Sequence, residues 1–202
     1  AVNHLEGHAL SPRLVDKVSF PYLLLLVSGA HTQLLAVHAP GIYERYGTTM
    51  DDAAGEAFDK SAKIMGLGYP GGPAIERIAA NGKVGLVQLP RPLRGADHCH
   101  FSFSGLKTAV ATRLAAIEAD DGEAGIADLA AALQAAIADC LADRARRAMA
   151  RFADAHGSAT LVIAGGVAAN KAIFTRLETE ACEAGFALSL SLIHISEPTR
   201  PC

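Results

Sequence analysis

Two histidines near the start of the chain have the spacing of metal ligands on a helix. His4 and His8 lie in the stretch HLEGH, four residues apart, so in a helix both side chains are on one face. Glu6 lies about 200° away around the same helix and points away from both. The zinc-protease pattern H-E-x-x-H instead places a glutamate beside the first histidine as general base. The pair therefore predicts a metal site without peptidase chemistry.

Two imidazoles do not hold a metal by themselves. A third ligand, which we expect to be a carboxylate, has to complete the site. No residue of the chain identifies itself as that ligand. The alternative interpretation is that the two histidines are unrelated surface residues.

Two glycine-bearing turns follow stretches that are typical of buried strands. The turn at residues 28–32 follows YLLLLV, and its amides and hydroxyls can face a phosphate; a plain hairpin is the alternative. The second stretch, TLVIAGGVAAN, is a strand, a double glycine and a helix with Asn170 in its first turn. Exposed N–H groups there favour anions or nucleotide oxygens, and tight strand–helix packing is the alternative. Together the turns resemble the phosphate and adenosine loops of actin-like ATPase folds.

Three carboxylates are spaced to share one face of a helix expected over residues 49–67. They are Asp52, Glu56 and Asp59, and like charges so placed repel one another. Binding of a ligand hydroxyl or a metal is one explanation, and an acidic surface is the other. Thr49 is the expected N-cap of this helix. Further on, Lys107 after Ser104 is explained by a capping serine and an exposed lysine.

The composition gives no global attraction to nucleic acid, because the formal net charge is −3. Each basic group taken alone is interpreted as solvated charge. The candidates for a local basic patch are Lys60, Lys63, Arg91, Arg94, Arg144, Arg146, Arg147 and Arg151. The four cysteines have no C-x-x-C spacing, so neither a disulfide framework nor a zinc knuckle is expected. With no leader and no apolar run long enough to span a membrane, we expect a cytoplasmic protein without a membrane partner.

Hydrophobic periodicity predicts alternating strands and helices, hence an α/β fold. The helix at residues 126–155 has a core-facing stripe at i, i+3 and i+4 spacing. The expected strands cover residues 22–28, 32–38, 43–46 and 159–166, and the expected helices cover residues 49–67, 74–80, 104–120, 126–155 and 167–185. Residues 81–103 are expected to be irregular.

The last residues do not fit the rest of the chain. Residues 190–200 can be encoded by a nucleotide sequence that resembles the transposon end of a sequencing-library adaptor. We therefore interpret residues 190–202 as a non-native tail, with residues 1–189 as the natural part.

Six motifs in order resemble the tRNA N6-adenosine threonylcarbamoyltransferase family, the bacterial type once called O-sialoglycoprotein endopeptidase. They are HLEGH, LLVSGAHTQL, DDAAGEAFDK, GLGYPGGP, FSFSGLKT and VIAGGVAANK, and they cover residues 1 to about 189. The resemblance implies an actin-like (ASKHA, ribonuclease H-like) two-lobed fold. It also implies transfer of threonylcarbamoyl from threonylcarbamoyl-AMP to N6 of the adenosine beside the anticodon in ANN-decoding tRNAs.

The resemblance further implies ligands and partners. His4 and His8 would hold one divalent metal per subunit, Fe²⁺ with Zn²⁺ as the alternative. The partners would be tRNA, threonylcarbamoyl-AMP, a TsaB-type paralogue and a TsaE-type ATPase. The substrate contacts would be Leu26, Val27, Ser28, Gly29, Ala30, Asp59, Gly72 and Asn170. Two other functions stay open: a metal-dependent endopeptidase, and a non-catalytic nucleotide-binding subunit.

The chain departs from the family pattern in three ways. Ala30 replaces the second glycine of the usual S-G-G-H loop, and it would be strained by roughly 1 kcal/mol if its φ were positive. The family's first phosphate-type hairpin is missing before Ala1, and its aspartate metal ligand is missing after about Ser189. We therefore expect an internal fragment, incomplete at both ends and inactive alone.

Overall fold

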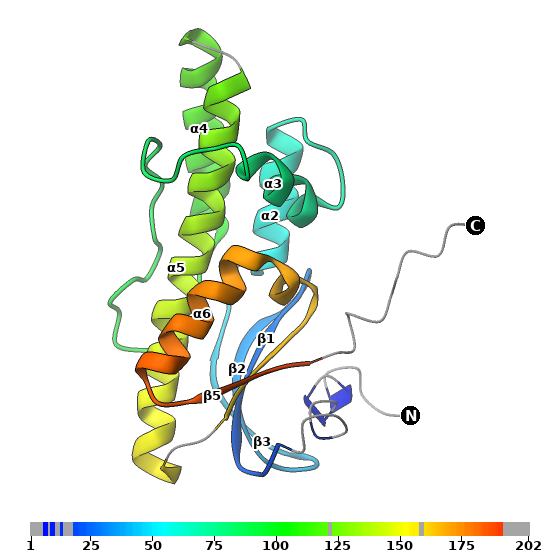
Figure 1. The fold of residues 1–202 in the computed structure, drawn as a ribbon, viewed down its shortest axis with the longest axis vertical. Helices are drawn as coiled ribbons and strands as arrows, with labels where there is room; N and C mark the ends of the chain where they lie inside the picture. Colours follow the sequence, from blue (N-terminus) through cyan, green and yellow to red (C-terminus); the bar gives the residue numbers. More distant parts are fainter. Residues whose placement is uncertain are drawn as a thin grey trace, which may run out of the picture.

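A five-stranded mixed sheet forms the base of the fold (Figure 1). The computed structural model describes residues 6–7, 9–10, 13, 18–120, 123–157 and 160–191. The strands are β1 (Tyr22–Val27), β2 (Thr32–Ala39), β3 (Ile42–Thr48), β4 (Thr160–Ala164) and β5 (Ala187–Leu190). Their order is β3-β2-β1-β4-β5. The pairs β1–β2 and β2–β3 are antiparallel, and the pairs β1–β4 and β4–β5 are parallel.

The central strand β1 explains the unbroken apolar run in the sequence. All six of its residues are buried, because it is flanked by β2 and β4 and covered on both faces. Strands covered on both faces are apolar at every position instead of at alternate ones. The prediction of a buried strand here is confirmed.

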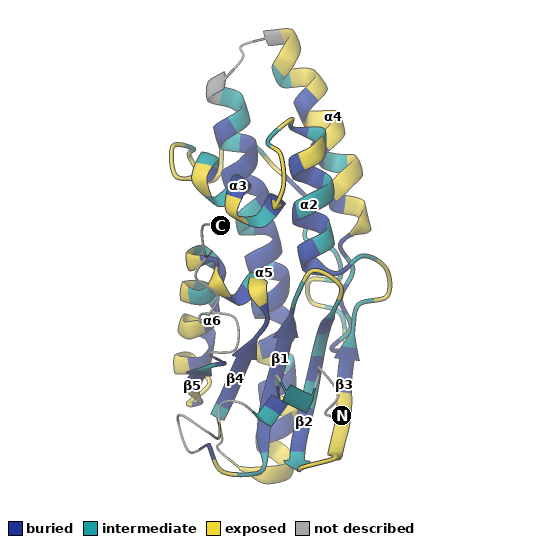
Figure 2. Cartoon of the chain, turned by 90° about the vertical axis from the view of Figure 1, so that its right-hand side faces the viewer, coloured by how far each residue is buried: buried dark blue, intermediate teal, exposed yellow. Residues whose placement is uncertain are grey.

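The helices α2 to α6 are packed on and above the sheet. α5 runs along the whole molecule, and with α6 it covers one face of the sheet (Figure 2). The helices are α2 (Ala54–Ile64), α3 (Gly71–Ala79), α4 (Ser104–Asp120), α5 (Glu123–His156) and α6 (Lys171–Glu183), and a 3-10 turn, η1 (Gly166–Ala169), precedes α6. The α/β prediction is therefore confirmed.

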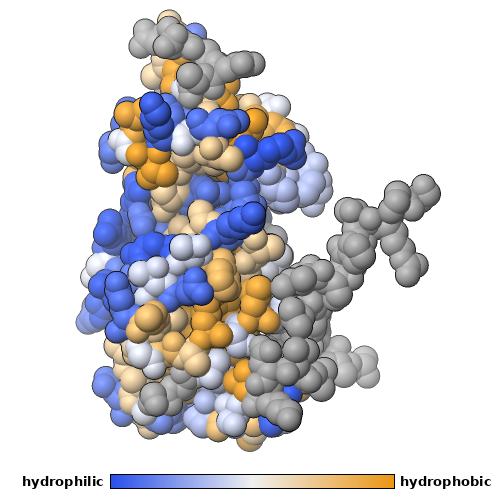
Figure 3. Space-filling view, in the orientation of Figure 1, coloured by the Kyte–Doolittle hydropathy of each residue, from blue (hydrophilic) through white to orange (hydrophobic). Residues whose placement is uncertain are grey.

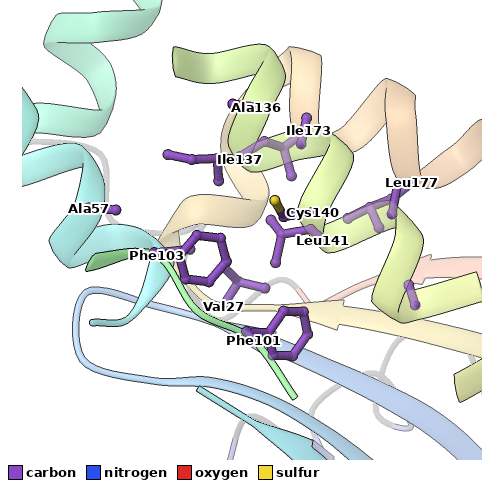
Figure 4. Close-up of a cluster of buried hydrophobic side chains, with 14 of the residues drawn as sticks. Val27, Ala57, Phe101, Phe103, Ala136, Ile137, Cys140, Leu141, Ile173 and Leu177 are labelled. Atoms are coloured by element: carbon purple, nitrogen blue, oxygen red, sulfur yellow. The ribbon is translucent and has the colours of Figure 1, made fainter. Parts of the chain in front are cut away.

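The main core lies between the sheet and α5. Side chains from β1, from the segment before α4 and from α5 meet there, among them Val27, Phe103 and Leu141 (Figure 4). The predicted stripe of α5 is confirmed from Leu129 onward, since Leu129, Leu133, Ile137, Leu141, Met149 and Phe152 are all fully buried. Its first member, Ile126, is half-buried at the edge of the core. On the opposite face of the sheet, a smaller cluster joins Tyr22, Leu24, Leu26 and Val162 to Ala9 and Val18.

α5 is also long and apolar enough, by length and composition alone, to cross a membrane. However, 67% of the most apolar stretch of α5 is buried within the described structure, as expected for a core helix. The face seen in Figure 3 mixes hydrophilic and apolar residues.

The helix expected over residues 49–67 is shorter than predicted, and Thr49 is not its N-cap. The Thr49 hydroxyl donates to the Asp52 carbonyl at 2.6 Å, which forms a turn before the helix. α2 begins at Ala54, whose N–H donates to the buried Thr32 hydroxyl oxygen at 2.9 Å. Glu56 accepts the N–H of Ala53 at 3.1 Å. The cap thus comes from strand β2, which local sequence rules do not reveal.

α4 is likewise capped from outside its own sequence. Asp51 accepts the N–H groups of Phe103 at 2.8 Å and Ser104 at 3.3 Å. It also accepts the hydroxyls of Ser102 and Ser104, at 2.5 and 2.8 Å. Ser104 is the first residue of the helix, and its hydroxyl donates to Asp51, so the prediction that Ser104 caps the helix is wrong. Lys107 is exposed as expected.

Most candidates for a basic patch are held in ion pairs. Arg144 is buried, with its guanidinium on Asp143 and on the carbonyls of Ala96 and His98, so its interpretation as solvated charge is wrong. The exposed arginines of α5 are also paired: Arg146 with Asp143, Arg147 with Asp97 and Arg151 with Glu44. These pairs leave little uncompensated positive charge on this side of α5.

Candidate functional site

A pocket of about 300 Å³ opens where β1 and β4 end. The two strands are parallel, so their carboxyl ends, and the glycine turns that follow them, meet at one edge of the sheet. In open α/β sheets this edge is where ligands bind. The lining residues are Gly29, Gly55, Phe58, Asp59, Tyr69, Pro70, Gly72, Pro73, Glu76, Gly166, Val167, Ala169 and Asn170.

The turn after β1 supplies the first wall. Ser28 closes it, with its N–H donating to the His31 carbonyl at 2.8 Å and its hydroxyl oxygen accepting the His31 N–H at 3.1 Å. Gly29 lines the pocket, whereas Ala30 is exposed outside it. Leu93 alone among the described non-glycine residues has a positive φ. The alanine in place of the usual glycine therefore carries no φ strain.

The first turn of α2 is packed directly against this loop. A Cβ at Gly55 would lie 2.6 Å from the Gly29 Cα and 2.6 Å from the Ser28 carbonyl oxygen, so only glycine fits there. Gly55 is the second residue of α2, and its N–H has no acceptor within the helix. The pocket is therefore bordered by the positive end of a helix, which favours a bound anion.

The double glycine after β4 supplies the facing wall. Gly165 has φ 101°, and a Cβ there would lie 2.2 Å from the Val27 carbonyl oxygen. Because of that close approach, η1 can cross over the end of β1. Asn170 then caps α6: its Oδ1 accepts the Ile173 N–H at 3.1 Å. The prediction that Asn170 lies in the first turn of the helix is therefore corrected by one position.

α3 forms the third wall and is tied to both of its neighbours. The Asp59 Oδ1 accepts the N–H of Gly71 at 2.8 Å, which leaves the second carboxylate oxygen of Asp59 for a ligand. The Glu76 Oε1 accepts the N–H of Lys171, at the start of α6, at 2.9 Å. Phe58 and Val167 add apolar surface. The pocket thus combines apolar walls, one available carboxylate oxygen and a helix N-terminus.

The three carboxylates expected on one helix face are used separately. Asp52 precedes α2 and pairs with Lys60, which also lies 3.4 Å from Glu56. The hydrogen bond to Asp52 is the main reason why the pKa of Lys60 is raised. Only Asp59 faces the pocket, so a common site for the three is excluded.

The structure brings together four of the eight predicted substrate contacts. Gly29, Asp59, Gly72 and Asn170 line the pocket. Leu26 and Val27 are buried in β1, where they hold the turn in place, and Ser28 and Ala30 lie beside the pocket without lining it. His4 and His8 lie outside the described residues. Within the described part of the chain, no group of three or more histidine, cysteine, aspartate or glutamate side chains could hold a metal.

Several lining residues were not predicted from the sequence. Gly55 and Phe58 are in a helix whose pattern is that of a core helix. Glu76 comes four residues after Gly72, which puts both on one helical face, and this spacing could have identified it. Val167 gave no signal, because an apolar residue after a strand is ordinary.

Comparisons with known sequences agree on one family. The TsaD family model, described as tRNA N6-adenosine threonylcarbamoyltransferase, matches residues 1–193. A tRNA N6-adenosine threonylcarbamoyltransferase from Maricaulis maris is 58% identical over 192 residues, which are 93% of this chain and 51% of that protein. One from Sphingopyxis alaskensis is 62% identical over 178 residues, 88% of this chain and 49% of that protein. The chain spans about half the length of these curated relatives.

A solved structure with the same fold is the activator of 2-hydroxyisocaproyl-CoA dehydratase from Clostridium difficile with bound ADPNP. Its TM-score is 0.51 at 16% identity, and the match covers 94% of this chain and 60% of that chain. At this identity the likeness concerns the fold alone. It agrees with the expected actin-like ATPase architecture, of which this chain is a part.

Proposed function

This chain belongs to the tRNA N6-adenosine threonylcarbamoyltransferase family, and from that premise we propose the reaction of the full-length protein. It transfers the threonylcarbamoyl group from threonylcarbamoyl-AMP to N6 of the adenosine beside the anticodon in ANN-decoding tRNAs. Because the chain spans about half of its relatives, we propose that it is an internal part of the enzyme that carries the adenylate pocket.

The pocket at the ends of β1 and β4 carries this proposal. An adenylate needs an apolar slot for the base, an acceptor for the ribose hydroxyls and donors for the phosphate. Phe58 and Val167 offer the slot, and the second oxygen of Asp59 offers the acceptor. Gly29, in the turn after β1, and Gly55, at the start of α2, offer backbone N–H groups to the phosphate.

The enzyme has mainly to position the two reactants of this reaction. The mixed carbamic–phosphoric anhydride is already activated, so N6 has only to be held against the carbamoyl carbon. Nitrogen forms the new bond to carbon, the bond from carbon to the phosphate oxygen breaks, AMP leaves with the electron pair, and N6 loses a proton. The start of α2 faces the phosphate that gains charge as AMP leaves, and it stabilises that charge.

A metal held by His4 and His8 belongs to the proposal, with Fe²⁺ preferred and Zn²⁺ as the alternative. When bound, it would act as a Lewis acid toward substrate oxygens. Two imidazoles suit either ion but need a third ligand. We propose that an aspartate of the full-length protein supplies it.

The endopeptidase alternative is disfavoured by the direction of Glu6. The Glu6 carboxylate accepts a hydrogen bond from the Tyr43 hydroxyl at 3.4 Å, so it is directed toward strand β3. The non-catalytic alternative leaves the histidine pair without a role. A TsaB-type paralogue, a TsaE-type ATPase and a cytoplasmic location remain parts of the proposal.

Replacement of Asp59 by asparagine tests the adenylate pocket. Asp59→Asn keeps an oxygen for the Gly71 N–H but replaces the free carboxylate oxygen by an amide. We expect kcat/KM of the full-length enzyme with its partner subunits to fall about tenfold or more, measured as threonylcarbamoyladenosine in tRNA by mass spectrometry. Asp154→Asn, on the exposed end of α5, is the control. Equal rates for Asp59→Asn and wild type would refute this role.

The histidine pair is tested in the same assay. We expect the double variant His4→Ala, His8→Ala of the full-length protein to form no modified tRNA and to lose bound metal, measured by elemental analysis. A normal rate would show that the metal role is wrong. The 202-residue chain by itself is expected to form no modified tRNA.

A further inference from the structure

The side chain of Asn170 is almost fully engaged by the protein itself. It is 6% exposed, and its Oδ1 accepts the Ile173 N–H at 3.1 Å as the cap of α6. Its Nδ2 donates to the Oε1 of Gln134 at 2.8 Å. Gln134 lies on α5, 36 residues earlier in the chain, and it is not among the residues that line the pocket at the ends of β1 and β4.

These two bonds fix the orientation of the Asn170 amide. Because Oδ1 is held by a backbone donor, the atom that faces Gln134 has to be Nδ2, and Gln134 has to present its oxygen. A primary amide has two N–H hydrogens in one plane. With one hydrogen on Gln134 and the oxygen on Ile173, the direction of the second hydrogen is set, and it is the one that remains for a ligand.

We propose that Gln134 is a positioning residue for the nucleotide pocket: it holds the Asn170 amide so that its second N–H serves the bound adenylate. This inference rests on the proposed function, since it assumes that an adenylate occupies the pocket. Gln134 would act only through Asn170 and would not touch the ligand.

Within the described part of the chain, the surroundings of Gln134 offer no other partner that would hold the Asn170 amide in this orientation. A second hollow, of about 550 Å³, lies between α3, α5 and the start of α6, and Gln134 and Ala169 contribute to its walls. Without the Gln134 oxygen, the Asn170 amide has room beside it and no partner for its Nδ2. The bond from Glu76 to the Lys171 N–H still ties α6 to α3, so α6 should stay in place while the amide loses its fixed orientation.

The test compares two substitutions at Gln134 in the full-length protein. Gln134→Leu keeps the size of the side chain but removes the acceptor, whereas Gln134→Glu keeps an oxygen for the Nδ2. Gln88→Leu is the matched control, because Gln88 is in the loop after α3 and donates only to the Gly85 carbonyl. Binding of AMP is measured by calorimetry, and threonylcarbamoyl transfer is measured with the partner subunits.

We expect Gln134→Leu to raise the Kd for AMP and the KM for the adenylate about tenfold, the effect of one lost hydrogen bond to a ligand, with kcat within about twofold of wild type. Gln134→Glu should restore binding, and Gln88→Leu should bind as wild type does. Equal AMP affinity for Gln134→Leu and wild type, or a loss in kcat alone, would overturn the inference. If wild type itself neither binds AMP nor modifies tRNA, the proposed function fails and the inference fails with it.

Discussion

Replacing Asp51 by alanine would remove the cap of α4. Its carboxylate accepts the N–H groups of Phe103 and Ser104 and the hydroxyls of Ser102 and Ser104, at distances from 2.5 to 3.3 Å. It thereby joins the turn before α2 to the start of α4, 52 residues later in the sequence. No other described side chain accepts these two N–H groups.

The expected loss of stability depends on which of these hydrogen bonds water can replace. An N-cap is worth about 1 kcal/mol and at most about 2. Asp51 is exposed, so the two serine hydroxyls regain hydrogen bonds to water and add little. We therefore expect Asp51→Ala to lower the free energy of unfolding by about 1.5 kcal/mol. Asp154→Ala, at an exposed site without such bonds, should change it by less than about 0.5 kcal/mol.

The contribution of Asp51 should also depend on pH. Burial alone would raise the pKa of Asp51, but the hydrogen bonds that it accepts outweigh burial and lower it. A lowered pKa means that the stabilisation is complete above the unfolded value of about 3.9 and is lost as the pH falls through the folded value. The difference between wild type and Asp51→Asn should therefore be constant near pH 7 and shrink below about pH 4.

Urea unfolding of the full-length proteins, followed by circular dichroism at several pH values, measures both effects. A change below about 0.5 kcal/mol for Asp51→Ala would refute the cap. A difference between wild type and Asp51→Asn that grows as the pH falls would refute the assigned direction of the pKa.

Three further outcomes follow from the same contacts. Gly55→Ala should weaken AMP binding at least tenfold, because its Cβ would lie 2.6 Å from the backbone of the turn after β1 and would displace that turn. Gly105→Ala, whose Cβ would meet nothing within 4 Å, should bind AMP normally, and equal affinities of the two variants would contradict this. Arg144→Leu should cost about 3 kcal/mol in urea unfolding, since it leaves the Asp143 carboxylate without its buried partner, and a cost below about 1 kcal/mol would argue against it. Burial raises the pKa of the Cys140 thiol to about 12, so iodoacetamide at pH 8 should modify the exposed Cys182 and leave Cys140 intact in peptide mass spectra, and equal labelling would refute its burial.

Local patterns were sufficient for the parts of the fold that depend on local chemistry. The apolar run of β1, the helix from Ser104 to Asp120 and the stripe of α5 lie where periodicity predicts them. The two glycine turns were expected to bind a ligand, and they meet because β1 and β4 are parallel neighbours.

Contacts between distant residues could not be predicted. Thr32 caps α2 across 22 residues, and Asp51 caps α4 across 52 residues, so each helix has a partner that its own sequence does not contain. The same holds for Arg144, whose carbonyl partners lie 46 and 48 residues away. A sequence shows the charge of such residues, but the chain path decides whether that charge is solvated or buried.

A crystal structure of the full-length protein with AMP tests the central claim most directly. We predict the base between Phe58 of α2 and Val167 of η1, a ribose hydroxyl within about 3.2 Å of the free oxygen of Asp59, and the phosphate at Gly29 and the start of α2. AMP bound elsewhere, with this pocket filled by side chains or water alone, would contradict it.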